Sequence, residues 1–127
     1  MDVQMKRGLL EVCVLSAIRD SDSYGYRIIK DMKPYVEISE STLYPILRRL
    51  EAAGTLSVRN ETHNGRLRKY YHILPAGEER IRQFREEWRE LTAVYRFITR
   101  PPAPPETESE DDGVDGGTLA GKGDRTP

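Results

Sequence analysis

The pattern of apolar and polar positions predicts three short helices, a β-hairpin and a longer fourth helix. Residues 5–18 are apolar at most positions, which is typical of a helix buried around most of its circumference. A second helix is expected to begin after Ser23, a residue type that caps helix N-termini, and to end before Pro34. Its buried face would carry residues at the spacing i, i+3, i+4, i+7: Gly25, Ile28, Ile29 and Met32.

The third predicted helix contains Pro45 within a helical pattern of apolar residues. It starts after Ser39 or Ser41 and stops at Gly54. If Ser41 is the cap, the proline removes only the first intrahelical hydrogen bond, whereas Ser39 as cap places it in the second turn and bends the helix. The apolar stripe is Leu43, Ile46, Leu47 and Leu50. The opposite face carries Ser41, Pro45 and Arg48, flanked by Tyr44 and Arg49.

Two β-like runs flank Asn64-Gly65, the dipeptide that most strongly indicates a hairpin turn. With these two residues as the turn, the register pairs Leu56 with Ile73 and Val58 with Tyr71. The apolar side chains therefore share one face of the hairpin. The opposite face carries its polar and charged side chains: Arg59, Glu61, Arg68, Tyr70 and His72.

A last helix is predicted from Pro75 to about Arg100, because apolar residues repeat there with alternating spacings of three and four. These residues are Ile81, Phe84, Trp88, Leu91, Tyr95 and Ile98. Such a narrow seam needs a partner helix, and the three short helices are occupied with their own core. The simplest partner is the same helix of a second copy, which gives a symmetric homodimer. The alternative is a long helix packed on its own domain.

Charge changes sign near the end of the chain. Residues 1–100 carry 18 Lys and Arg against 14 Asp and Glu, whereas residues 101–127 carry 2 against 7. The last segment starts with PPAPP, is rich in Gly and has too few large apolar residues to offset the entropy lost on ordering. We expect residues 101–127 to be a disordered acidic tail. It is either a solvated solubility segment or one that competes with a polyanion for the basic body.

Several functional classes are disfavoured. No run approaches the roughly 18 to 20 apolar residues of a membrane span, and the N-terminus lacks the features of a signal peptide, so we expect a cytoplasmic protein. Cys13 lies in an apolar stretch and is expected in the core. Both histidines lie in the hairpin, without a Cys/His set, a phosphate-binding loop or a nucleophile constellation. We therefore expect neither an enzyme nor a metal or cofactor.

The order of elements is that of a winged helix-turn-helix domain, mostly α with a small hairpin, over residues 1–74, followed by a dimerisation helix over residues 75–100. The third helix would read the major groove and the hairpin would be the wing. Candidates for contacting double-stranded DNA are Ser41, Thr42, Tyr44 and Arg48 in the helix, Arg66, Arg68 and Lys69 in the wing, and Lys6 and Arg7 in the first helix.

Five segments carry a more specific likeness: MKRGLLEVCVLSAI, YGYRIIKDM, STLYPILRRLEAAGTL, GRLRKYYHI and PAGEERI. With them the chain resembles the PadR-like transcriptional regulators, in particular the compact subfamily with a single C-terminal helix. The resemblance spans residues 5 to about 95. It implies a dimeric repressor that binds a palindromic operator, often near its own gene, and is released by a small molecule or another signal.

By position, the resemblance also implies a set of DNA-contacting residues: Lys6, Tyr24, Ser41, Thr42, Tyr44, Pro45, Arg48, Gly65, Arg66, Arg68, Lys69 and Tyr70. In some drug-binding relatives a tryptophan on the last helix stacks on flat aromatic ligands. Phe84 and Trp88 are therefore candidates for binding an effector, with packing alone as the alternative. Relatives commonly cap the last helix with Thr, whereas this chain has Leu74, so that helix start is satisfied differently or frays.

A protein-binding winged-helix module, using the last helix and the acidic tail, is the alternative function. Salt dependence separates the two, because phosphate contacts release counterions and make DNA affinity fall steeply with salt.

Overall fold

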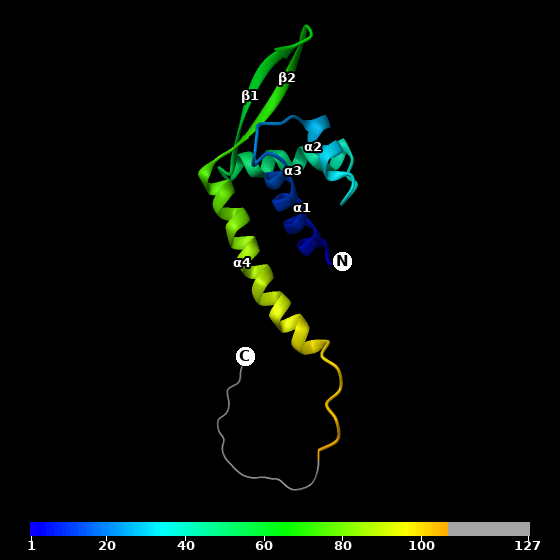
Figure 1. Ribbon diagram of the computed structural model, residues 1–127. Helices are drawn as coiled ribbons and strands as arrows, with labels where there is room; N and C mark the ends of the chain where they lie inside the picture. The colour runs from blue at the N-terminus through cyan, green and yellow to red at the C-terminus, as the bar shows by residue number, and fades with distance from the viewer. Residues whose placement is uncertain (107–127) are drawn as a thin grey trace. The chain divides into compact units, whose positions relative to one another are not determined.

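The computed structural model describes residues 1–106. It contains four helices and one two-stranded antiparallel sheet, so the predicted fold class is confirmed (Figure 1). The elements are α1 (Val3–Ala17), α2 (Gly25–Met32), α3 (Glu40–Ala52), β1 (Leu56–His63), β2 (Arg66–Ile73) and α4 (Pro75–Ile98). Among these residues no helix is both long and apolar enough to cross a membrane. Most of the expected acidic tail, residues 107–127, lies outside the described residues.

Helix α1 begins two residues earlier than its apolar pattern predicted, because Asp2 caps it. The Asp2 carboxylate accepts hydrogen bonds from the backbone N–H groups of Gln4 at 3.0 Å and Met5 at 3.2 Å. These are donors that a helix start otherwise leaves without partners. The helix buries Leu10, Val14 and Leu15.

The prediction that Ser23 caps α2 is wrong. The cap position is Tyr24, which makes no side-chain cap hydrogen bond. Ser23 instead forms a β-bridge with Tyr71: the Ser23 N–H donates to the Tyr71 carbonyl at 3.2 Å, and the Tyr71 N–H donates back at 2.7 Å. The segment before α2 thus pairs with the free edge of β2 and ties the base of the hairpin to the helices.

Helix α3 starts after Ser39, the earlier of the two predicted caps. Pro45 is therefore the sixth residue of the helix, and the Ser41 carbonyl has no N–H donor at position 45. The apolar stripe is buried as predicted. The helix ends at Ala52, two residues before Gly54, whose φ of +76° provides the left-handed stop.

The hairpin has the predicted register, from Leu56 opposite Ile73 to His63 opposite Arg66. Asn64 and Gly65 both have positive φ, at 51° and 79°, as a two-residue type I′ turn requires.

At the start of helix α4 the hydrogen bonds among the described residues are made by backbone groups. The Leu74 N–H donates to the Thr55 carbonyl at 3.0 Å, and the Leu74 carbonyl accepts from Gly77 at 2.8 Å and Glu78 at 3.1 Å. Pro75 stands first in the helix, where no N–H donor is needed. Backbone groups therefore satisfy this helix start, where relatives commonly have a threonine cap.

The core lies where α1, α2, α3 and the base of the hairpin meet, within the compact unit formed by residues 1–94. Its large, fully buried side chains include Leu15, Ile28, Leu47 and Leu56. Ile81 of α4 also belongs to it. That residue was assigned to the dimer seam, but it is only 5% exposed in a single chain, so we leave it out of the proposed interface.

Candidate nucleic-acid interface

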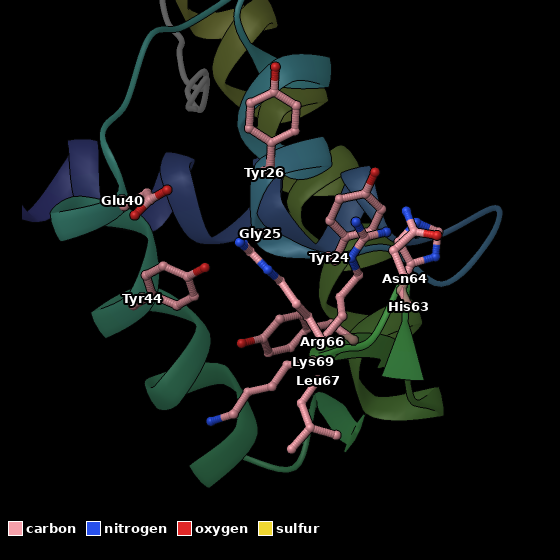
Figure 2. A pocket seen from close by; sticks show the side chains of 12 residues that line it. Tyr24, Gly25, Tyr26, Glu40, Tyr44, His63, Asn64, Arg66, Leu67 and Lys69 are labelled. Atoms are coloured by element: carbon pink, nitrogen blue, oxygen red, sulfur yellow. The ribbon is translucent and has the colours of Figure 1, made fainter. Parts of the chain in front are cut away.

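A groove of about 770 Å³ opens between α3, the start of α2 and the hairpin (Figure 2). Five of the predicted DNA-contacting residues line it: Tyr24, Tyr44, Arg66, Arg68 and Lys69. Residues that were not predicted also line it, notably Tyr26, Glu40, His63, Asn64 and Leu67. The fold therefore brings the hairpin cations to the same groove as the tyrosine of α3, from segments more than twenty residues apart in the sequence.

Tyr44 is positioned by Gly25, the first residue of α2. A Cβ atom at position 25 would collide with the Tyr44 hydroxyl and lie 3.0 Å from its Cζ. The half-buried tyrosine ring therefore lies directly against the backbone of α2. The helical spacing identified Gly25 only as part of an apolar stripe, because a close approach between two helices leaves no mark in the sequence.

Arg68 is held by two aromatic rings. Its Cζ lies 3.8 Å from the centre of the Tyr24 ring, and its Nη1 donates to the Tyr70 hydroxyl at 3.3 Å. The two tyrosines pack edge to face, with centroids 5.6 Å apart. A guanidinium over a ring face gains cation–π attraction and loses freedom of movement, while several of its N–H donors remain available.

Asp22, which precedes α2, binds both strands at the base of the hairpin. The sequence did not indicate this role. The Asp22 carboxylate accepts from Arg59 of β1 and is 2.8 Å from the His72 Nδ1 of β2. The hydrogen bond with His72, together with Arg59, lowers the pKa of Asp22 despite some opposing burial. Arg59 also donates to Glu61 at 2.6 Å. The neighbouring bridge at Ser23 brings Asp22 to the sheet, and no sequence pattern indicated that bridge.

The cations divide into paired and unpaired groups. Arg48 is exposed on α3, whereas the next residue, Arg49, donates to Glu11 at 3.0 Å. Within residues 1–106, all the cations assigned to DNA from the resemblance lack an ion pair: Lys6, Arg48, Arg66, Arg68 and Lys69. Arg7 was proposed as a DNA contact from the charge pattern and not from the resemblance. It is ion-paired, with its Nε 3.7 Å from Glu11 Oε2.

Other predicted residues lie outside the groove. Ser41 and Thr42 are exposed in the first turn of α3, where the Ser39 hydroxyl is 2.9 Å from that of Ser41 and donates to that of Thr42 at 3.4 Å. Pro45 is half-buried on the same helix. Tyr70 supports Arg68, Gly65 forms the hairpin tip, and Lys6 is exposed on α1.

A second, more apolar groove of about 300 Å³ lies between α1 and α4. Phe84 and Trp88 stack along it, with ring centroids 5.9 Å apart, and Leu91 continues the row. Trp88 is 52% exposed and Leu91 is 50% exposed. Further large apolar side chains of α4 are also exposed: Val94, Tyr95, Phe97 and Ile98. Of these, Val94 and Phe97 were not part of the predicted seam.

Comparison with known proteins gives a consistent result. The profile of the transcriptional regulator PadR-like family matches residues 14–83. The structure of a transcriptional regulator from Clostridium thermocellum is 30% identical with a TM-score of 0.69, covering 79% of this chain and 99% of that one. A PadR family transcriptional regulator from Eggerthella lenta is 31% identical with a TM-score of 0.68, covering 78% and 89%. Transcriptional regulator Rv3488 of Mycobacterium tuberculosis is 29% identical over 89 residues, 69% of this chain and 83% of that protein.

Proposed function

The chain belongs to the PadR-like family of transcriptional regulators, and on this premise we propose that it binds a specific operator in double-stranded DNA. Helix α3 enters the major groove and the hairpin acts as the wing. The observation that carries the proposal is a set of cations that have no ion pair within residues 1–106. Arg48 is exposed on α3, and Arg66, Arg68 and Lys69 of the hairpin line the groove of Figure 2. Glu40 also lines the groove but forms no ion pair with them in the described part of the chain, so these cations are free to neutralise phosphates.

Each element has a distinct role in this proposal. Ser41, Thr42 and Arg48 are exposed along α3 and reach base edges or flanking phosphates. Arg66 and Lys69 of the hairpin contact the backbone of the duplex. Arg68, held against its two tyrosines, needs little ordering on binding, which lowers the entropic cost of its contact.

The regulator acts as a homodimer through α4. The proposal is supported by the apolar row of α4, because contiguous apolar surface usually marks an interface. This row consists of the exposed residues Trp88, Leu91, Val94, Tyr95, Phe97 and Ile98. A two-fold symmetric dimer presents two copies of α3 and so matches a palindromic operator. The dimer represses transcription, and a small molecule or another signal acting at the α1–α4 groove, beside Phe84 and Trp88, relieves it.

Selection of bound fragments from the organism's own DNA by purified protein tests this function. We expect a small set of fragments that share an inverted repeat. Affinity for such a fragment, measured by fluorescence anisotropy, should fall linearly on a double-logarithmic plot against salt, with a slope of about −0.9 per phosphate contact. Equal and nearly salt-independent affinity for all fragments would contradict DNA binding and favour the protein-binding module, whose docking surface would be the apolar row of α4.

A further inference from the structure

The carboxylate of Glu11 is buried at a junction of three helices. It belongs to α1, and its side chain is only 11% exposed. One oxygen, Oε2, accepts from Arg49 Nε of α3 at 3.0 Å, and the other, Oε1, accepts from Arg80 Nη2 of α4 at 2.6 Å. Two helices that are distant in the sequence therefore bind opposite oxygens of one carboxylate.

This carboxylate is ionised at neutral pH. Burial alone would raise the pKa of Glu11, but the hydrogen bonds and charges of Arg80 and Arg49 outweigh it and leave the pKa below its ordinary value. Loss of one of these arginines would leave a buried charge only partly compensated, so the carboxylate would move toward its remaining partners, which include Arg7 at 3.7 Å, or toward water. The positions of the two arginines are therefore energetically linked.

The two arginines connect different surfaces. Arg49 follows Arg48, the exposed cation of α3, in the sequence. Arg80 lines the α1–α4 groove together with Phe84 and Trp88. A change at that groove that moves Arg80 has a direct hydrogen-bonded route, through Glu11, to the helix proposed to read DNA.

We infer that Glu11 is a positioning residue that couples α4, through Arg80, to α3, through Arg49. Its consequence for DNA affinity rests on the proposed function, whereas the coupling between the helices does not. Occupation of the α1–α4 groove, or a shift of α4, would change the placement of α3. Glu11 itself contacts no nucleic acid in this scheme.

Hydrogen exchange of the free protein tests the coupling without DNA. Arg80→Gln is compared with Arg82→Gln, a change of the same charge on the same helix at a residue whose ion pair is with Glu79. We expect amides of α3 to exchange about tenfold faster in Arg80→Gln, a change within the range typical of coupling between sites. Amides of α2 should be unchanged in both variants, because α2 has no residue in the cluster.

A purely structural role would instead raise exchange in α2 as much as in α3, and that result would overturn the inference. Glu11→Gln serves as the second variant, because the amide retains one acceptor oxygen. It should give the same exchange pattern, faster in α3 and unchanged in α2. If the Glu11→Gln variant does not fold, the comparison of Arg80→Gln with Arg82→Gln still tests the coupling.

The second measurement uses a duplex selected by the unmodified protein. Arg80→Gln should weaken affinity by about tenfold, as expected for coupling energies of this class, although Arg80 lies on α4. Arg82→Gln should bind like the unmodified protein. Equal α3 exchange and equal affinity for the two variants would overturn the coupling. Absence of DNA binding by the unmodified protein would contradict only the proposed function, since the exchange measurement judges the coupling alone.

Discussion

At the scale of single residues, Arg48 and Arg49 show how neighbouring side chains of the same type acquire different roles. Both lie in α3 between two leucines of its apolar stripe. The sequence placed Arg48 on the outer face of the helix and Arg49 on the flank of that face. The structure pairs Arg49 with the buried Glu11 and leaves Arg48 exposed and unpaired among the described residues. The difference arises because Glu11 lies 38 positions earlier in the chain, on another helix.

Replacing Arg48 with alanine should therefore weaken operator binding by about 1–3 kcal/mol if it contacts a base edge, with little change in melting temperature. The matched variant Arg49→Ala should lower the melting temperature, because it removes a partner of a buried carboxylate. Thermal unfolding separates the two variants, because the loss of operator affinity measured by fluorescence anisotropy is accompanied by a loss of stability only in Arg49→Ala. Unchanged affinity for Arg48→Ala would mean that α3 does not read DNA with this face.

Tyr44 is also more than a surface residue, since its ring packs on Gly25. Gly25→Ala should displace the ring and reduce operator affinity, because the added methyl group collides with the hydroxyl. Gly8→Ala is the control: its Cβ would meet nothing within 4 Å, and it should stabilise α1 by up to about 1 kcal/mol. Equal operator affinity of the two variants would show that the position of Tyr44 is unimportant for binding.

At the scale of elements, the hairpin illustrates both the reach of sequence patterns and their limit. Its turn and register followed from Asn64-Gly65 and the alternation of apolar residues, which are local signals. Its attachment did not, because the bridge at Ser23 and the carboxylate of Asp22 come from a segment some fifty residues earlier.

Asp22 should make the attachment of the hairpin sensitive to acid. Its pKa in the folded protein lies below the unfolded value of roughly 3.9, held there by His72 first and by Arg59. The stabilisation is therefore present above about pH 4 and lost as pH falls through the lower, folded pKa. Asp22→Asn should reduce stability at pH 6 and flatten its decline toward pH 3 in urea unfolding. Asp20→Asn, at a highly exposed aspartate, should behave as the unmodified protein.

At the scale of the whole molecule, the apolar row of α4 is not covered by the core that buries Ile81. Leu91→Glu should convert the proposed dimer into a monomer, since placing a carboxylate in an apolar interface costs several kcal/mol. Light scattering coupled to gel filtration measures the mass. Arg89→Glu, two residues away at an exposed ion-paired arginine, should leave the mass unchanged. A dimeric mass for Leu91→Glu would place the interface elsewhere.

The sequence by itself determined the elements, their order, the hairpin register and the buried apolar stripe of α3. Periodicity, turn chemistry and capping act over a few residues, so they are readable locally; even so, a local signal failed at Ser23, where pairing with Tyr71 prevailed over capping. Only the tertiary structure decided which cations have no ion pair among residues 1–106, that the Tyr44 ring packs on Gly25, and that Glu11 joins α3 to α4. These features depend on contacts between distant segments, and the energy of such a contact depends on the burial and geometry that folding creates.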